Sequence, residues 1–347
     1  MSSILSNLGD LVRIRTGKLD ANANDPDGAF PFFTCAKEPL RISSYSYDCE
    51  CVLVAGNGDL NVKYYKGKFD AYQRTYIIES LNSEILDVRY LYHFMDTYLE
   101  KLRHKSIGGV IKYIKIGNLT EAVLPLPPLA DQRRIVAILD QSHALRTKRR
   151  KALAQLDSLT ESIFIEMFGD MSIGPKFDLG SIRPFVEANS GKSAKAVLSE
   201  DRTDIPIYGG NGINGWATTA LYEHPVLIFG RVGQQCGNAF ISEGPSWVTD
   251  NAIVVRVSDN TRLNPVFLLH AFRRSSFSNR VKHLDLPFIN QGMILDNPIP
   301  IAPLSVQQIF SNRIKSVEAL KLSHLASLTN FDLLFGSLQH RAFRGEL

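Results

Sequence analysis

The chain has 347 residues, a net charge of +4 and 44% hydrophobic residues. This length and composition suit a well-folded globular protein with room for two ordinary domains. The mildly basic balance permits a nucleic acid as partner without requiring one.

The cysteines and the hydropathy of the chain indicate the compartment of the cell in which we expect the protein. Its four cysteines, Cys35, Cys49, Cys51 and Cys236, match neither a disulfide scaffold nor the paired spacing of a zinc site. No stretch of about 18 apolar residues occurs, and the first twenty residues contain several charges. We therefore expect reduced thiols, no signal peptide, no membrane span and a cytoplasmic location.

Residues 1–128 have the pattern of strands and helices that is typical of a mixed α+β domain. Short β-branched runs, such as VLVAG at 52–56 and RTYIIE at 74–79, lie between turn residues and predict strands. The stretch VRYLYHFMDTYLEKLRHK at 88–105 predicts one helix. The segment ends in the proline-rich run LPLPPL at 124–129, which predicts a stiff extended hinge that fixes the angle of the next element.

A long helix is predicted after this hinge. Residues 131–168 contain no proline, and Gly169 follows them. Apolar residues recur along the segment as a heptad seam that is interrupted at Ser142 and Arg149. The seam consists of Ile135, Ile138, Leu145, Ala152, Leu156, Leu159 and Ile163.

The second half of the chain repeats the first. A shift of 175 positions carries Pro128-Leu129 onto Pro303-Leu304 and Gln132 onto Gln307. The same shift aligns Leu124-Pro125-Leu126 with Ile299-Pro300-Ile301, and Phe168 with Phe343. Residues 173–303 therefore repeat the α+β domain, and after a one-residue adjustment VLIFG at 226–230 takes the place of VLVAG at 52–56.

The second long helix, at 306–341, carries its own seam of Phe310, Val317, Leu320, Phe331, Leu334 and Leu338. Because 175 is a multiple of seven, both seams keep one heptad register. A helix of about 57 Å cannot bury such a stripe in one small domain. We expect the two helices to pair as an antiparallel coiled coil, with a pseudo-two-fold axis relating the halves.

The predicted organisation has four parts: domains at 1–128 and 173–303, and helical segments at 129–172 and 304–347. A search for reaction centres finds little in any of them. The GKS at 191–193 lacks the upstream glycine of a phosphate loop, and no Asn/Asp-Pro-Pro-aromatic motif of a DNA amino-methyltransferase occurs. His224 with Cys236, or His283 with Asp285, are better explained as surface or packing residues.

The loops of both domains hold what a reader of duplex DNA needs, namely cations for phosphates and amide or guanidinium groups for base edges. In the first domain the candidates are Asn57, Lys63, Lys66, Tyr72, Arg74, Lys105, Ser106 and Lys112. In the second they are Asn211, Asn214, Trp216, Arg231, Gln234, Gln235, Arg280, Lys282 and His283. Equivalent loops with different side chains predict two different base sequences.

Three segments carry a resemblance to a known family. They are LPLPPLADQRRIVAILD at 124–140, LDSLTESIFIEMFGD at 156–170 and SLQHRAFRGEL at 337–347. With the echo IAPLSVQQIF at 301–310, they resemble the specificity subunit of type I restriction-modification systems, and the resemblance spans nearly the whole chain. It implies two target-recognition domains, each reading half of a split DNA sequence, and two spacer helices in an antiparallel coiled coil.

The resemblance also implies partners and cofactors. The family's specificity subunit has no catalysis of its own, holds two methyltransferase subunits and recruits restriction subunits that translocate DNA. Those partners would use S-adenosylmethionine, ATP and Mg, and this chain would need no cofactor, no metal and no membrane. The second spacer departs from the pattern: Ser305-Val306-Gln307 replaces the acidic-Gln pairing, and the basic run 146–151 has no counterpart.

Two other functions remain open from the sequence alone. A metal-dependent nuclease would use carboxylates such as Asp48, Glu50 and Asp59, and would cleave DNA as an isolated chain. A scaffold protein would use its long helices for assembly alone and would show no affinity for specific DNA.

Overall fold

The computed structural model describes residues 4–233, 236–258, 262–275, 277 and 287–347. The chain divides into two compact units. The first comprises Met1–Lys151 and Leu325–Leu347, and the second comprises Ala152–His324. Each unit contains one α+β part and a segment of each long helix, as the repeat requires. The four-part division at 128, 172 and 303 stays a prediction, because the compact units cut across both helices.

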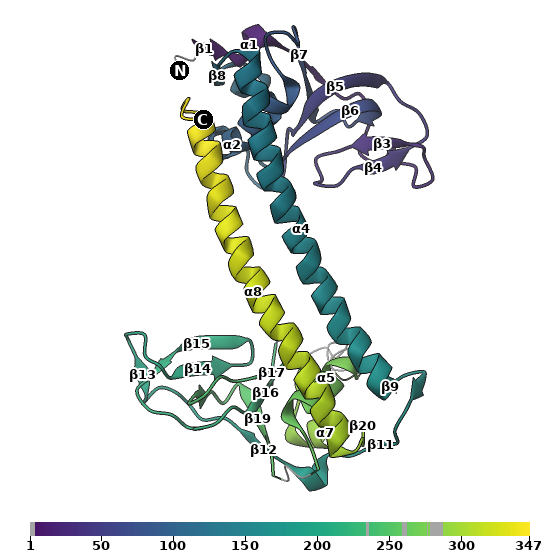
Figure 1. Ribbon diagram of the computed structural model, residues 1–347, viewed down its shortest axis with the longest axis vertical. Helices are drawn as coiled ribbons and strands as arrows, with labels where there is room; N and C mark the ends of the chain where they lie inside the picture. Colours follow the sequence, from purple (N-terminus) through teal and green to yellow (C-terminus); the bar gives the residue numbers. More distant parts are fainter. Residues whose placement is uncertain (1–3, 234–235, 259–261, 276, 278–286) are drawn as a thin grey trace. The chain divides into compact units, whose positions relative to one another are not determined.

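The first unit is built on a six-stranded sheet in the order β2-β7-β5-β6-β3-β4 (Figure 1). All neighbours are antiparallel except the parallel pair β3 and β6. The strands are β2 Val12–Thr16, β3 Phe30–Phe33, β4 Leu40–Ile42, β5 Tyr47–Ala55, β6 Val62–Ala71 and β7 Thr75–Ser80. A separate antiparallel pair joins β1 Ile4–Asn7 to β8 Val123–Leu126, with the short helices α1 Leu8–Leu11 and α3 Ile116–Thr120 beside it.

The apolar run in β5 is continuous because both faces of the sheet are buried. Side chains alternate along a strand, so Val52 and Val54 face one cluster and Leu53 faces another. The first cluster includes residues of helix α2 Val88–Lys105, whose N-terminus is capped by the side chain of Asp87. The expected strands and helix of this domain are confirmed.

The second unit repeats this plan in its main sheet, β12-β19-β16-β17. Its strands are β12 Val186–Ser190, β16 Leu227–Gly230, β17 Ala239–Ile241 and β19 Ala252–Val257. They correspond in order to β2, β5, β6 and β7. Helix α5 Pro265–Arg274 takes the place of α2, and α7 Gln291–Leu295 that of α3. The antiparallel pair β11 Leu179–Gly180 with β20 Ile299–Pro300 matches β1 with β8.

The units differ beyond this shared frame. The second unit adds a separate four-stranded sheet, β13-β15-β14-β18, where the first continues its main sheet through β3 and β4. These strands are β13 Leu198–Ser199, β14 Pro206–Gly209, β15 Gly212–Ala217 and β18 Trp247–Val248. Two further short elements, β9 Gly169–Asp170 with β10 Gly174–Pro175 and the 3-10 turn η1 Arg183–Phe185, follow the first long helix.

The long helices are α4 Leu129–Phe168 and α8 Leu304–Ala342. Within each unit their segments run antiparallel and side by side (Figure 1). In the first unit, Arg146 contacts Asp332 at 2.5 Å. In the second, Lys321 contacts Asp157 at 2.8 Å. These two ion pairs are the same pair in the repeat, because a shift of 175 carries Arg146 onto Lys321 and Asp157 onto Asp332. The antiparallel pairing of the two helices within each unit and the internal repeat are confirmed.

The predicted seam is right at about two thirds of its positions. In α4 the buried and half-buried positions recur with alternating spacings of three and four at Gln132, Ile135, Leu139, Ser142, Arg146, Arg149, Leu153, Leu156, Thr160, Ile163 and Met167. In α8 the same pattern holds Gln307, Phe310, Ile314, Val317, Lys321, His324, Leu328, Phe331, Phe335, Leu338 and Ala342. Seven of the twelve predicted packing residues belong to this stripe: Ile135, Leu156, Ile163, Phe310, Val317, Phe331 and Leu338. An eighth, Ile138, lies next to the stripe and is half-buried.

The other four predicted packing residues, Leu145, Leu159, Leu320 and Leu334, are 40–52% exposed, and their prediction is wrong. The neighbouring position occupies the seam in each case. The guanidinium of Arg146 lies 4.3 Å from the ring centroid of Phe335 and also binds Asp332. At Arg146 and Lys321 a long polar side chain fills the seam with its aliphatic stem, so a search for apolar residues alone misplaces the register at these two positions.

A buried glutamine joins each long helix to its α+β part. Gln132 is fully buried, and its Nε2 donates to the carbonyls of Ile85 and Pro127 at 2.8 and 2.9 Å. Gln307 does the same with Arg262 and Ala302, at 3.1 and 2.8 Å. The repeated Pro-Leu-x-x-Gln motif therefore sets a hydrogen-bonded joint at the start of the helix.

Candidate nucleic-acid interface

The loop after β5 is held by three backbone hydrogen bonds. The N–H of Gly56 donates to the carbonyl of Arg74 at 2.8 Å, and the N–H of Ile114 donates to the carbonyl of Gly56 at 2.9 Å. The N–H of Gly58 donates to the carbonyl of Lys112 at 2.9 Å. Three loops that are distant in the sequence, around residues 56, 74 and 112, thus meet at one end of the sheet.

A Gly-Lys turn after β2 joins the same place. The N–H of Lys18 donates to the carbonyl of Ala71 at 3.2 Å. A Cβ on Gly17 would lie 2.1 Å from that carbonyl oxygen, so the close approach of the two chains requires glycine. The side chain of Lys18 is exposed.

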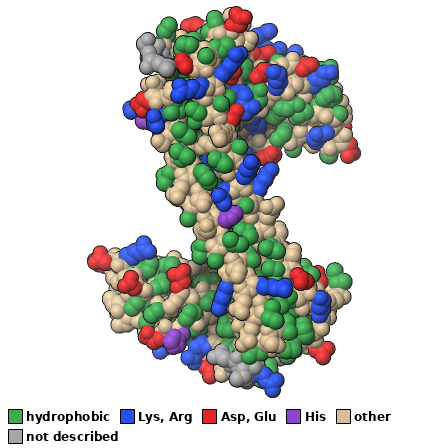
Figure 2. All heavy atoms as spheres, viewed as in Figure 1, with side chains coloured by type: hydrophobic (Ala, Val, Ile, Leu, Met, Phe, Trp, Pro, Cys, Tyr) green, Lys and Arg blue, Asp and Glu red, His purple; other side chains and the backbone are tan. Residues whose placement is uncertain are grey.

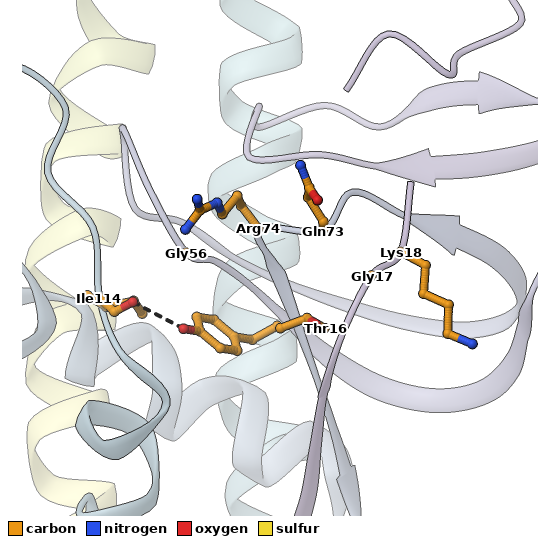
Figure 3. Close-up of a pocket in the computed structure, with 8 residues that line it drawn as sticks. Thr16, Gly17, Lys18, Gly56, Gln73, Arg74 and Ile114 are labelled. Atoms are coloured by element: carbon orange, nitrogen blue, oxygen red, sulfur yellow. Dashed lines mark hydrogen bonds between the residues drawn. The ribbon is translucent and has the colours of Figure 1, made fainter. Parts of the chain in front are cut away.

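These loops surround a cavity of about 470 Å³ (Figure 3). The side chains of Lys18, Gln73 and Arg74 line it and supply its cationic and amide groups (Figure 3). The hydroxyl of Tyr76 donates to the carbonyl of Ile114 at 3.1 Å, and burial raises the pKa of Tyr76. The remaining lining residues are Thr16, Gly17 and Gly56. We call the backbone hydrogen bonds Gly56–Arg74, Ile114–Gly56 and Lys18–Ala71 the frame of this cavity. Side chains on the frame offer donors for phosphates and base edges.

The second unit builds the same frame from equivalent residues. The N–H of Arg231 donates to the carbonyl of Asn251 at 3.1 Å, and the N–H of Ile289 donates to the carbonyl of Arg231 at 2.9 Å. The N–H of Lys192 donates to the carbonyl of Val248 at 2.8 Å. Gly191 is again required, since its Cβ would lie 2.3 Å from the carbonyl oxygen of Thr249.

The two frames present different side chains. Gln73 and Arg74 precede β7 in the first unit, whereas Asp250 and Asn251 precede β19 in the second. All four are exposed. Arginine pairs best with guanine and asparagine with adenine in the major groove, so the same frame can present different base preferences.

The sequence search missed Lys18, Lys192, Asp250 and Asn251 as members of this site. The pairs Gly17-Lys18 and Gly191-Lys192 could have been found, because they repeat at nearly the spacing of the two halves. The pair Asp250-Asn251 carries no signal of its own. Its place becomes visible only once the strand pairing is known.

The predicted residues of the first unit fall into two groups. Arg74 is exposed and lines the cavity, and Lys112 is exposed in the loop that leads to Ile114. Asn57 and Tyr72 are half-buried in the loops that form the cavity. The others have partners within the chain. Lys66 and Lys105 form ion pairs with Glu50 and Glu121, at 3.0 and 3.6 Å, and the hydroxyl of Ser106 donates to the carbonyl of Arg103 at 2.6 Å.

Lys63 is a correction. Its ammonium group donates to Asn61 and to the carbonyl of Thr34, and burial lowers its pKa. The side chain is thus tied to the protein rather than presented to a ligand. We remove it from the candidate set because a phosphate contact needs a solvent-facing cation.

In the second unit, Asn211, Asn214 and Arg231 are exposed. Trp216 is half-buried, and the guanidinium of Arg202 lies 4.8 Å from its ring centroid. The turn that holds Asn211 approaches the frame closely, since a Cβ on Gly210 would lie 2.9 Å from Gly230 Cα. Gln234, Gln235, Arg280, Lys282 and His283 lie outside the described residues.

Charge alone does not outline the interface. On the visible face of the first unit, Lys and Arg side chains are interspersed with Asp and Glu (Figure 2). This face carries no continuous basic patch, and the candidate site is defined here by its positioned loops.

Neither a metal centre nor a membrane span is found in the part of the chain that the structure describes. No group of three or more His, Cys, Asp or Glu side chains there is placed to hold a metal ion. Glu50, one of the carboxylates considered for a nuclease, instead accepts from the hydroxyl of Tyr64 at 2.7 Å and pairs with Lys66. No helix among these residues is long and apolar enough to cross a bilayer.

Comparisons with known proteins decide the family. The profile described as the type I restriction modification DNA specificity domain matches residues 5–156. The chain is 40% identical, over 393 residues, to the Type I restriction enzyme EcoDI specificity subunit of Escherichia coli, covering 98% of this chain and 87% of that protein. The chain belongs to the specificity subunits of type I restriction enzymes.

A further specificity subunit and two solved structures are also similar to the chain, and the solved structures share its fold. A second Escherichia coli specificity subunit, EcoprrI, is 23% identical over 215 residues, which is 57% of this chain and 53% of that protein. The crystal structure of the S subunit from M. genitalium has a TM-score of 0.71 at 17% identity, covering 99% of this chain and 96% of that one. A chain from a structural study of complex assembly and conformational transition in the type I system has a TM-score of 0.56 at 15% identity, covering 99% of this chain and 98% of that one.

Type I specificity subunits are the non-catalytic recognition components of restriction-modification complexes, so the chain serves DNA target recognition and complex assembly. The resemblance inferred from the sequence is confirmed. The nuclease and pure-scaffold alternatives are wrong.

Proposed function

We propose that this specificity subunit reads a split target in double-stranded DNA, one half-site with each unit. One observation carries the proposal: the same hydrogen-bonded frame recurs in both units with Gln73-Arg74 in one and Asp250-Asn251 in the other. A repeated frame with different exposed donors supports two half-sites of different sequence.

The exposed lysines of the two Gly-Lys turns would contact phosphates and set the register of each unit on the duplex. The paired helices α4 and α8 would fix the separation of the half-sites. Half-sites that face one side of B-DNA lie about 34–36 Å apart, which is about ten base pairs. Neither unit would read the base pairs that lie between the two half-sites.

The finer partner assignments belong to the same proposal. Two modification subunits, which would use S-adenosylmethionine, would bind the outward faces of the helices and the neighbouring surfaces of the α+β parts. Restriction subunits, which would use ATP and Mg, would join that complex. The chain itself would need none of these cofactors.

Selection from a pool of random duplexes tests the proposal. The full chain, together with its modification subunits, is incubated with the pool, and the bound DNA is sequenced. We expect two short blocks of preferred bases separated by a fixed number of unselected positions. A single block, or a pool without preference, contradicts the proposal.

A further inference from the structure

Residues 107–113 of the first unit form a narrow loop with an apolar tip. The loop is closed by two backbone hydrogen bonds between Ile107 and Tyr113, of 3.0 and 2.8 Å. Gly108 has a φ of +120°, and a Cβ there would lie 2.5 Å from the carbonyl oxygen of Ile111, so the turn requires glycine. Val110, at the tip, is fully exposed, and Ile111 is 63% exposed.

The base of this loop is firmly attached to the frame of the candidate interface. Ile114 is 3% exposed, and its N–H donates to the carbonyl of Gly56. Its own carbonyl accepts from the hydroxyl of Tyr76 (Figure 3). The carbonyl of Lys112 accepts from Gly58. Ile114 and Gly56 also line the cavity that holds Lys18, Gln73 and Arg74. The base of the loop therefore belongs to the wall of that cavity, and its hydrogen bonds support the tip.

The surroundings of the tip suit a polyanion. Lys112 and Lys115, on either side of Tyr113, are both exposed. Two adjacent apolar side chains in water gain nothing for the folded chain alone, whereas contact with an apolar surface would remove them from solvent. Duplex DNA offers both features in one ligand, since its phosphates attract the lysines and its base stack is apolar.

We propose that Val110 and Ile111 form a wedge that enters a groove of the first half-site and inserts between two base pairs. Side chains such as Ile, Leu and Phe act in this way in proteins that kink DNA. The narrow tip favours insertion, because a broad apolar face could not pass between the backbones. The wedge would separate one base step, so that the first unit would recognise how readily that step unstacks as well as its base edges. This inference rests on the proposed function.

The test uses the full chain with its modification subunits and a target duplex obtained by the selection described above. 2-Aminopurine is placed at successive positions of the half-site, because its fluorescence rises when it is unstacked. We expect a rise at one step with the wild-type chain. The Val110→Ser/Ile111→Ser double variant should lose this rise and bind the target about tenfold more weakly. The burial of two side chains of this size contributes at least a tenfold factor in affinity.

Two variants serve as controls. Ile173→Ser removes an apolar side chain that is 88% exposed in the second unit, and it should behave like the wild type. Lys112→Ala should keep the fluorescence rise and reduce the salt dependence of binding by about one phosphate contact, whereas the double variant should leave that dependence unchanged. Thermal unfolding checks that all variants are folded.

The outcomes separate this inference from the proposed function. If the wild-type complex selects no sequence, the proposed function fails. If it selects a target but shows no unstacked step, or if the double variant binds and unstacks normally, the wedge is wrong. A double variant that loses its modification subunits while binding DNA normally would show that the tip contacts protein, and this result also overturns the wedge.

Discussion

The side chain of Gln132 accepts a hydrogen bond from the backbone N–H of Asp87 at 2.9 Å. Asp87 in turn caps helix α2, with its carboxylate accepting from the N–H groups of Arg89 and Tyr90 at 2.9 and 3.0 Å. In the second unit the side chain of Gln307 accepts from the N–H of Asn264, which caps α5. The long helix is therefore fastened to the capping residue of a helix in the α+β part.

Replacing this glutamine should destabilise the first unit. Gln132→Met keeps the length of the side chain but leaves the N–H of Asp87 and two carbonyls without partners. We expect the free energy of unfolding to fall by roughly 1–3 kcal/mol, the cost of burying unsatisfied polar groups. Urea denaturation measures the change. Gln141→Met, at an exposed position of the same helix, is the control and should change stability little; equal losses in both variants would contradict the joint.

The buried His270 predicts a pH dependence of stability. Burial lowers its pKa to about 4, and Arg273 and Lys321 act in the same direction. An unfolded chain, with an ordinary pKa near 6.5, binds more protons between these values. The stabilisation is therefore complete above about pH 6.5 and is lost as the pH falls towards 4, by an amount on the order of 3 kcal/mol.

The measurement compares wild type and His270→Gln by urea denaturation from pH 4.5 to 7.5. At pH 7.5 the variant should be less stable, because the ring of His270 packs 5.4 Å from that of Phe310. The difference should shrink as the pH decreases. His340→Gln, at an exposed position on α8, is the control, and its free energy of unfolding should vary with pH as that of the wild type does. A constant difference between wild type and His270→Gln would contradict the assignment.

The sequence was sufficient to infer that the α+β part is repeated and that the two long helices pair with each other. The shift of 175 positions relates β1 with β8 to β11 with β20, and it relates the ion pair Arg146–Asp332 to Lys321–Asp157. The seam could not be inferred at Arg146 and Lys321, because these residues occupy packing positions that hydropathy assigns to solvent. Their burial depends on partners from the other helix, which a pattern along one helix does not contain.

The candidate site was less predictable. Loop composition identified Arg74 and Lys112, but it also selected Lys63, which is held by Asn61 and Thr34. Whether a lysine faces water or its own backbone depends on the strand pairing around it. The equivalence of Arg74 and Asn251 likewise required the backbone hydrogen bonds that place each beside a strand end.

Exchanging the side chains of the two frames should change base preference in one half-site at a time. Arg74→Asn should weaken selection at one position of the first half-site by about 1–3 kcal/mol and shift it from guanine towards adenine. The second half-site should remain as in the wild type. Sequencing of selected duplexes measures both halves in one experiment. Loss of preference in both blocks together would contradict the assignment of Arg74 to one half-site.

The Gly-Lys turns should contribute phosphate contacts rather than specificity. Lys18→Ala and Lys192→Ala should each weaken binding to all sequences and lower the slope of log affinity against log salt concentration by about 0.9. Lys63→Ala is the matched control in the first unit and should leave this slope unchanged, because its ammonium group is bound within the protein. A changed preference at one base in either Gly-Lys variant would instead assign that lysine to a base edge.

Lengthening the coiled coil should change only the separation of the half-sites. Insertion of one heptad at equivalent positions of α4 and α8 keeps the seam in register and adds about 10.5 Å at 1.5 Å per residue. At 3.4 Å per base pair this corresponds to about three pairs. We expect selected duplexes to keep both blocks of bases and to gain about three unselected positions between them. An insertion of two residues in each helix, which breaks the heptad register, should lower stability and serves as the control. Unchanged spacing in the heptad variant would show that α4 and α8 do not set the distance between half-sites.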